Sequence, residues 1–201
     1  IDGVDQGSVS NVGGTDTILF SQMENLNGQA GDDRFQFTSD GVISGIIDGG
    51  SHINGDIVDY SLLSVVDINV ADAFNGVVNA EIIQGNNTDS TLTAGNILNN
   101  WLITGENDGE LNGLIFIDFN NLIGGTGVDN FVFESLASIT GLVDGGAGVG
   151  VTDTVDLTAI DSDIVVAVDG SINADLNIVG IEQLDANNSF NNQLIASNTN
   201  N

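Results

Sequence analysis

The sequence contains no cysteine and no proline, and Arg34 is the only basic residue among 201. Without cysteine, neither disulfide bonds nor thiolate metal sites can form. No apolar run approaches the roughly 20 residues that a helix needs to cross a bilayer, so we expect no membrane insertion. Glycine is frequent, with 27 residues. A glycine-rich chain that lacks proline and is rich in β-branched residues is typical of many short strands joined by tight turns.

Aromatic residues are also scarce, at 5%, although 41% of the chain is hydrophobic. This apolar fraction is sufficient for a packed core and excludes a wholly disordered chain. The core must therefore be built mainly from Val, Ile, Leu and Ala.

Positive charge is nearly absent, because 29 acidic residues against one basic residue give a net charge of −28. Nucleic acids and anionic membrane surfaces are bound through Lys and Arg, so neither is an expected partner. The carboxylates also repel one another and weaken the compact state unless cations neutralise them. Two interpretations of the charge stay open: specific sites for divalent cations, above all Ca²⁺, or a generally acidic surface suited to high salt.

A long internal repeat organises the chain. Residues 23–37 recur 96 positions later as residues 119–133. Further matches follow in the same order, with an offset that reaches 101: residues 43–50 with 139–146, 56–61 with 153–158, and Asn86-Asn87 with Asn187-Asn188. The sequence therefore predicts two repeats of about 100 residues, at about 1–100 and 101–201.

The ends of the chain fit this division. Ile1-Asp2-Gly3 resembles Ile103-Thr104-Gly105, and the chain stops at Asn200-Asn201, where Asn99-Asn100 leads into Trp101. Neither end resembles the polar cap of a natural solenoid. We therefore expect about two units of a longer array, stacked on neighbouring repeats of the same or identical chains.

A shorter period lies inside each repeat. Gly85, Gly105, Gly125 and Gly145 are spaced by 20 residues, with short β-type runs between them. A turn about every 20 residues is typical of one rung of a parallel β-solenoid. The predicted fold is all-β: one continuous parallel β-solenoid over 1–201, similar to a β-helix or β-roll, with rungs of about 20 residues and these glycines in one column. An antiparallel sandwich and two separate domains of about 100 residues are the alternatives.

Residues 124–131 carry the pattern that predicts chemistry. They read G-G-T-G-V-D-N-F and match the turn G-G-x-G-x-D-x-U, where U is a large apolar residue. Glycine permits positive φ angles and leaves backbone carbonyls accessible, and Ca²⁺ binds six to eight carbonyl and carboxylate oxygens. The candidate Ca²⁺-binding residues in this turn and its relatives are Gly28, Gly31, Asp32, Asp33, Asp48, Asp56, Asp89, Gly124, Gly125, Gly127, Asp129, Asp144 and Asp153.

This motif and its context from Trp101 to Gly125 resemble the hemolysin-type calcium-binding (RTX) repeats of giant secreted bacterial surface proteins and adhesins. The resemblance covers nearly the whole chain and implies secretion, a calcium-dependent β-roll or β-helix, and a role in adhesion or matrix building. The chain departs from the family because it has at most one motif per rung, and because Gln29 replaces a glycine in the first copy. Occupied Ca²⁺ sites and empty turns descended from such sites are both compatible with this pattern.

The function expected from these features is non-enzymatic: a structural or spacing segment of an extracellular, calcium-stabilised adhesin or fibre at the bacterial cell surface. The alternative is a module that binds glycans or another surface with one solenoid face. A carbohydrate-active β-helix enzyme is a remote alternative, because the acidic groups are duplicated whereas a catalytic site is usually singular. We expect His52 to be an exposed turn residue and Trp101 to lie in the core.

Overall fold

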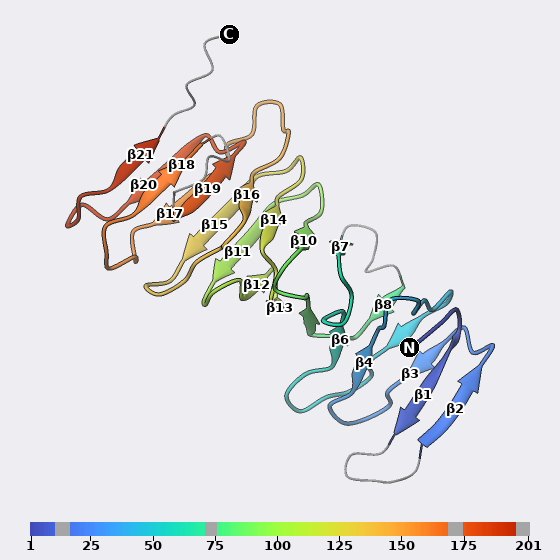
Figure 1. Ribbon diagram of the computed structural model, residues 1–201. Helices are drawn as coiled ribbons and strands as arrows, with labels where there is room; N and C mark the ends of the chain where they lie inside the picture. The colour runs from blue at the N-terminus through green and yellow to red at the C-terminus, as the bar shows by residue number, and fades with distance from the viewer. Residues whose placement is uncertain (11–16, 71–75, 169–174, 196–201) are drawn as a thin grey trace.

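The computed structural model describes residues 1–10, 17–70, 76–168 and 175–195, and its regular structure is dominated by short β-strands (Figure 1). The strands are β1 (Gln6–Ser10), β2 (Thr17–Ser21), β3 (Leu26–Asn27), β4 (Arg34–Gln36), β5 (Ile47–Asp48), β6 (Ile57–Asp59), β7 (Val66–Asn69), β8 (Val77–Val78), β9 (Ile82–Gln84), β10 (Ser90–Thr93), β11 (Asn99–Ile103), β12 (Gly109–Leu111), β13 (Leu114–Ile117), β14 (Asn121–Ile123), β15 (Asp129–Phe133), β16 (Leu142–Asp144), β17 (Thr154–Leu157), β18 (Val165–Ala167), β19 (Leu176–Val179), β20 (Gln183–Ala186) and β21 (Gln193–Ile195).

Most strands pair in parallel, in one sheet of seven strands and one of nine. The seven-stranded sheet has the order β21-β18-β19-β16-β14-β10-β7, and the nine-stranded sheet has the order β20-β17-β15-β11-β12-β13-β9-β6-β4. A parallel sheet β3-β5-β8 and the hairpin β1-β2 complete the N-terminal end (Figure 1). Among the described strands, antiparallel pairing is confined to β1-β2 and to β11-β12-β13. The prediction of an all-β fold with parallel strands is confirmed, and the antiparallel sandwich is wrong.

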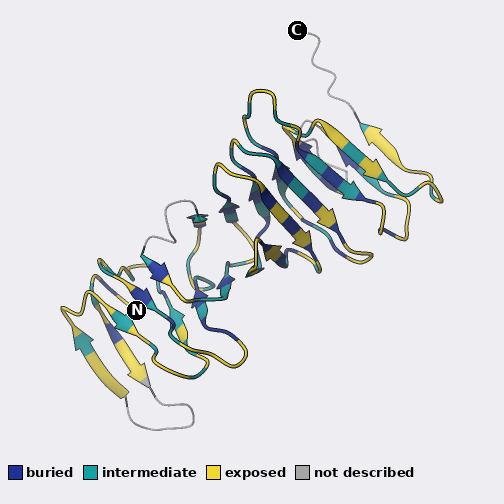
Figure 2. Cartoon of the chain, turned by 180° about the vertical axis from the view of Figure 1, so that it is seen from behind, coloured by how far each residue is buried: buried dark blue, intermediate teal, exposed yellow. Residues whose placement is uncertain are grey.

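The main core lies between the two large sheets, whose strands alternate buried and exposed side chains (Figure 2). Strand β11 buries Trp101 and Ile103 and exposes Leu102. Trp101 stacks on Phe131 of β15, with ring centroids 5.2 Å apart, and meets Phe116 of β13 edge-on at 6.0 Å. The single tryptophan is therefore a core residue, as predicted.

The long sequence repeat is also a repeat of strand pairing. Leu26 pairs with Ile47 between β3 and β5, and Leu122 pairs with Val143 between β14 and β16, so both partners recur 96 residues later. Other pairings recur at slightly larger offsets: Arg34-Ile57 as Asn130-Thr154, Val58-Ile83 as Val155-Leu184, and Ile47-Val77 as Val143-Ile178. Small insertions between strands therefore account for the increase in the separation between matching residues of the two repeats, while the register of the paired strands is kept.

A hairpin occupies the same place in each copy. The pairs Gly7-Phe20 and Ser8-Leu19 of β1-β2 correspond to Gly109-Phe116 and Glu110-Ile115 of β12-β13. Ahead of the hairpin, the N–H of Thr38 donates to the carbonyl of Ile1 just as the N–H of Glu134 donates to that of Ile103. Ile1 and Ile103 therefore accept equivalent hydrogen bonds. The first hairpin is longer than the second, which explains why the offset between matching residues is larger before the hairpin than after it.

The predicted rung length of about 20 residues does not hold throughout. Parallel partners are 21 residues apart where Leu122 meets Val143, but 35 apart where Leu142 meets Asn177. An additional strand is the physical reason, because β18 lies between β16 and β19 in the chain but on the far side of β19 in the sheet. The predicted glycine column is also wrong for Gly105, whose carbonyl accepts the N–H of Ser138 instead of lying beside Gly125. Asn200-Asn201, which the sequence analysis matched with Asn99-Asn100, lie outside the described residues.

The stacked rings give a first test of the core. Phe131→Ala should lower the free energy of unfolding by about 3 to 5 kcal/mol, because it removes a fully buried ring and leaves a cavity. Val132→Ala is the matched control in the same strand, since Val132 is 38% exposed and should cost about 1 kcal/mol or less. Urea unfolding followed by the fluorescence of Trp101 measures both. Equal losses would contradict the placement of Phe131 in the core.

Candidate metal-binding site

Acidic residues mark the start of parallel strands in the nine-stranded sheet. The first carboxylate row consists of the residues that immediately precede β4, β6 and β9: Asp33, Asp56 and Glu81. The second carboxylate row begins β15 and precedes β17 and β20: Asp129, Asp153 and Glu182. Neighbouring parallel strands begin on the same side of a sheet, so both rows lie along the side where these strands begin. Strands β11, β12 and β13 separate the two rows.

Within each row, the second and third carboxylates each accept the backbone N–H of the preceding member of the row. The N–H of Asp33 donates to Oδ1 of Asp56 at 2.7 Å, and the N–H of Asp56 donates to Oε2 of Glu81 at 2.9 Å. In the second row, the equivalent hydrogen bonds from Asp129 to Asp153 and from Asp153 to Glu182 measure 2.9 and 2.8 Å. The carboxylates therefore tie the start of one strand to the start of the next and help to fix the parallel register.

Glycines of the preceding turns make room for the other carboxylate oxygens. A Cβ atom at Gly28 would collide with both Oδ2 of Asp33 and the carbonyl oxygen of Gly49. The equivalent sets are Gly49 with Asp56 and Asn79, Gly124 with Asp129 and Gly145, and Gly145 with Asp153 and Gly180. Each glycine thus allows a carboxylate oxygen and a backbone carbonyl oxygen to converge on one small space.

Three of these carboxylates keep a buried oxygen without a hydrogen-bond partner, namely Oδ2 of Asp33, Asp56 and Asp129. Asp56 and Asp129 are fully buried. A buried carboxylate without a positive partner costs several kcal/mol, so these oxygens require either a proton or a cation. Ca²⁺ is bound by carboxylate and carbonyl oxygens, and the converging oxygens therefore fit the ion that the resemblance implies.

Burial raises the pKa of Asp129 to about 6, and repulsion from Asp153 acts in the same direction. Two donors oppose this shift, because Asn99 Nδ2 lies 2.7 Å and Trp101 Nε1 lies 3.4 Å from Oδ1 of Asp129. Burial also raises the pKa of Asp33, with repulsion from Asp56 and Asp32 adding to it.

The pKa of Asp153, the next member of the second row, is also raised. Its burial is the main cause, and repulsion from the carboxylates of Glu182 and Asp144 adds to it. The one basic side chain does not relieve either row. Arg34 binds Asp59 instead, at 2.6 Å from Nη2 to Oδ2. In the described part of the chain, neither row therefore has an arginine or lysine partner.

The remaining predicted ligands act at turns outside the rows. Asp32 is exposed and accepts the N–H groups of Ile53 and Asn54, which hold the pKa of its carboxyl well below the usual range. The other acidic candidates are placed as follows: Asp48 accepts the side-chain amides of Asn27 and Asn79, Asp144 accepts the N–H of Gly146, and Asp89 is exposed in a turn. The other glycines are Gly31 and Gly125, with φ of 134° and 106°, and Gly127, which packs against the carbonyl of Ile97.

The sequence analysis missed the third member of each row. Glu81 and Glu182 lie five residues before the paired asparagines Asn86 and Asn187, at the same offset of 101 residues. This repetition was a usable signal, but neither glutamate lies inside a glycine turn. The sequence analysis also missed the contacts of Gly49 and Gly145 with the rows. Each of these glycines lies against an aspartate that is further along the chain than the aspartate of the G-G-x-G-x-D motif.

His52 is exposed, as predicted, but it has a partner. Its Nδ1 lies 2.9 Å from Oε2 of Glu81. Ligand atoms of His52, Asp56 and Glu81 lie within 4.8 Å of one another. The first row therefore has an imidazole beside it, whereas histidine occurs nowhere else in the sequence.

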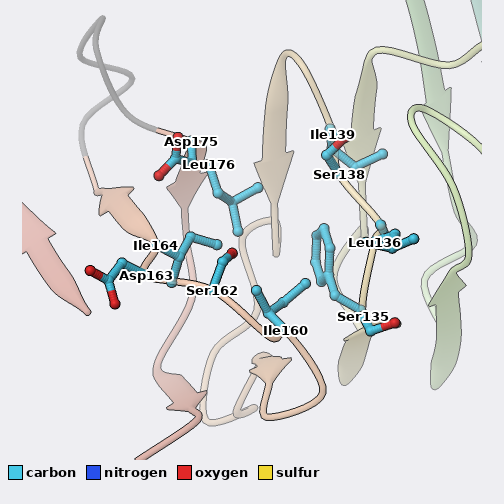
Figure 3. Close-up of a pocket in the computed structure, with 12 residues that line it drawn as sticks. Ser135, Leu136, Ser138, Ile139, Ile160, Ser162, Asp163, Ile164, Asp175 and Leu176 are labelled. Carbon is cyan, nitrogen blue, oxygen red and sulfur yellow. The ribbon is translucent and has the colours of Figure 1, made fainter. Parts of the chain in front are cut away.

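A separate cavity of about 280 Å³ lies in the second repeat (Figure 3). Its floor is apolar, with Phe133, Ile139 and Ile160, and Figure 3 shows Asp163 and Asp175 on its far side from Leu136. None of the predicted Ca²⁺ ligands lines this cavity.

No protein family, no curated protein and no solved structure matches the chain in sequence or fold comparison. Within the described residues, no helix has the length and apolar character needed to span a membrane.

Calcium-free protein should show the raised pKa of Asp129 in its stability. The protonated form of Asp129 is favoured in the folded chain, so its contribution is fully present below about pH 4 and is lost as the pH rises through about 6. The melting temperature in chelator should therefore fall between about pH 4 and pH 6, and Asp129→Asn should remove part of that fall. Asp161→Asn is the control, because Asp161 is exposed. The same pH profile for all three proteins would contradict the assignment.

Proposed function

We propose that this chain is a calcium-stabilised structural segment of an extracellular repeat protein, an adhesin or fibre of a bacterial surface. The observation that carries the proposal is the set of buried Oδ2 atoms of Asp33, Asp56 and Asp129, which have no hydrogen-bond partner. They share their space with backbone carbonyls in a chain whose net charge is −28. A bound cation satisfies these oxygens and relieves the repulsion between neighbouring carboxylates.

The proposal includes a β-solenoid architecture. Successive strands β14, β15, β16 and β17 alternate between the seven-stranded and nine-stranded sheets, and each pairs in parallel with an earlier strand of its sheet. A chain that winds between two parallel sheets in this way is the arrangement expected for stacked rungs. The duplication of several pairings at offsets of about 100 residues supports a spacing role, since such a unit can be added repeatedly without altering its neighbours.

Calcium removal tests the proposal. At a free concentration 100-fold above the dissociation constant, each site adds about 2.7 kcal/mol to the stability of the fold. Two sites would rival the roughly 5 to 15 kcal/mol of a typical domain. Chelation should therefore lower the melting temperature by about 10 °C or more, at 2 to 4 °C per kcal/mol for a chain of this size.

The matched variants are Asp129→Ala, which should lose part of the calcium response, and Asp161→Ala, which should keep all of it. Isothermal titration calorimetry then counts the ions. A melting curve that does not change on chelation would show that the glycine turns are structural and that calcium has no role.

The cavity of Figure 3 favours a second candidate function, a module that binds a glycan or another small polar ligand. Its rim carries Ser135, Ser162, Asp163 and Asp175 over an apolar floor. Hydroxyl and carboxylate groups around an apolar surface are the groups that orient small ligands in pockets. A glycan array probed with the chain and with Asp163→Ala tests this candidate, and binding that survives the substitution would place it elsewhere.

A further inference from the structure

One side-chain amide nitrogen is surrounded by more oxygen atoms than it can serve. Asn99 begins β11 and is only 1% exposed. Its Nδ2 lies 2.8 Å from the carbonyl oxygen of Gly95 and 3.1 Å from that of Ile97. It also lies 3.1 Å from the carbonyl oxygen of Gly124 and 2.7 Å from Oδ1 of Asp129. An amide has only two N–H bonds, so these four oxygens, the acceptor pocket, share two donors.

Two turns that lie beside each other build the acceptor pocket. The turn between β10 and β11 supplies two of its carbonyls, and the turn between β14 and β15, together with the first residue of β15, supplies the other two oxygens. Strands β11 and β15 are parallel partners, with their first residues opposite each other (Figure 1). Glycines permit the close approach, because a Cβ atom at Gly125 would collide with the carbonyl oxygen of Gly95, and one at Gly127 with that of Ile97.

Asn99 also stands where the second carboxylate row continues toward β11. The register that carries Asp129 to Asp153 between β15 and β17 carries Asn99 to Asp129 between β11 and β15. The row therefore changes at this point from carboxylates to a neutral amide. A carboxylate here would face Oδ1 of Asp129 and three carbonyls, and it would need a cation between them.

A chain of hydrogen bonds fixes which end of the Asn99 amide faces the pocket. The backbone N–H of Asn100 donates to Oδ1 of Asn112 at 2.9 Å, so this oxygen is an acceptor. Nδ2 of Asn112 then donates to Oδ1 of Asn99 at 3.0 Å, which leaves Nδ2 of Asn99 for the pocket. Asn112 lies between β12 and β13, with a φ of 51°. The hairpin therefore sets the orientation of the buried amide.

We propose that the acceptor pocket is a divalent-cation site closed from within, in which the side-chain amide of Asn99 takes the place of the ion and joins the two turns. Carbonyl and carboxylate oxygens are the ligands of Ca²⁺, at about 2.3 to 2.6 Å, so the oxygens would close in by about 0.5 Å around an ion. The choice of ion rests on the calcium role proposed above. Calcium is then assigned to the other side of Asp129, where its Oδ2 and the carbonyl oxygen of Gly145 converge on Gly124.

The substitution Asn99→Asp tests the closed pocket, because it exchanges the amide for a carboxylate of nearly the same shape. The variant should bind one more Ca²⁺ than wild type, as counted by isothermal titration calorimetry. The difference in melting temperature between calcium and chelator should exceed that of wild type by about 5 to 10 °C. Asn100→Asp is the matched control, since it adds the same charge on an exposed side chain of the same strand, and it should bind as many ions as wild type.

The substitution Asn99→Ala supplies a second measurement, because it removes the amide and keeps all the oxygens of the pocket. Its melting temperature in chelator should fall, and saturating Ca²⁺ should restore most of the loss as an ion enters the vacated space. Phe131→Ala is the control, because it removes a buried ring of the neighbouring strand. Calcium should stabilise Phe131→Ala no more than it stabilises wild type.

The hydrogen-bond chain is tested by Asn112→Asp. The new carboxylate can still accept the N–H of Asn100, but it repels Oδ1 of Asn99. The amide of Asn99 should then turn over and present Oδ1 to the pocket, where only a cation satisfies the converging oxygens. This variant should therefore also gain one Ca²⁺, although its substitution lies outside the pocket.

Two results overturn the proposal: Asn99→Asp that binds no more ions than Asn100→Asp, or Asn99→Ala that gains no more from calcium than Phe131→Ala. An Asn99→Asp chain that is unfolded in chelator and folds in calcium supports it, and one that is unfolded in both overturns it. The two proposals fail separately. Wild type that ignores chelation, beside Asn99→Asp that binds an ion, rejects calcium in the natural chain and retains the closed pocket. Wild type that needs calcium, beside Asn99→Asp that gains no ion, does the reverse.

Discussion

The rest of the structure depends on one electrostatic problem: carboxylates are buried at the edge of a sheet, beside backbone carbonyls, in a chain with one basic residue. Oδ2 of Asp129 is inaccessible and has no hydrogen-bond partner, and its neighbour in the row is a second buried aspartate, Asp153. Arg34 is engaged elsewhere, with Asp59. Neutralisation must then come from solvent, as a proton at low pH or as a cation at neutral pH.

The same carboxylates explain how the fold tolerates unequal loops. Oδ1 of Asp153 accepts the N–H of Asp129, and Oε2 of Glu182 accepts the N–H of Asp153, so the start of each strand is fixed to the start of the next. A loop between two strands can then lengthen without shifting the register in which the strands pair. In these turns glycine is needed where the carboxylates crowd the preceding turn, as at Gly124, where any side chain would collide with Asp129.

Much of the strand pairing and of the two carboxylate rows could be predicted from the sequence, because duplication makes a weak pattern visible twice. The matches of residues 23–37 with 119–133 and of Ile1 with Ile103 correspond to pairings and hydrogen bonds in the structure. The motif also led to Asp33, Asp56, Asp129 and Asp153, which the structure places in the two rows. It led equally to Asp32 and Asp48, which bind backbone and amide groups of nearby turns.

What the sequence could not provide was the partner of each residue across the stack. The 20-residue glycine spacing is a property of the chain, whereas pairing depends on how much loop lies between strands, and Gly105 therefore meets Ser138 rather than Gly125. Glu81 was overlooked because a residue ahead of a strand becomes a ligand candidate only when the neighbouring strand is known.

The two hairpins show how far burial in such a molecule is decided by the neighbour rather than by the local sequence. Both have the same register, yet Leu111 of β12 is 2% exposed and Val9, the equivalent residue of β1, is 57% exposed. The difference is that β12 lies between β11 and β13, whereas β1 pairs only with β2 among the described strands. In a stack where each unit contacts only the next, stability is a sum of units and of interfaces.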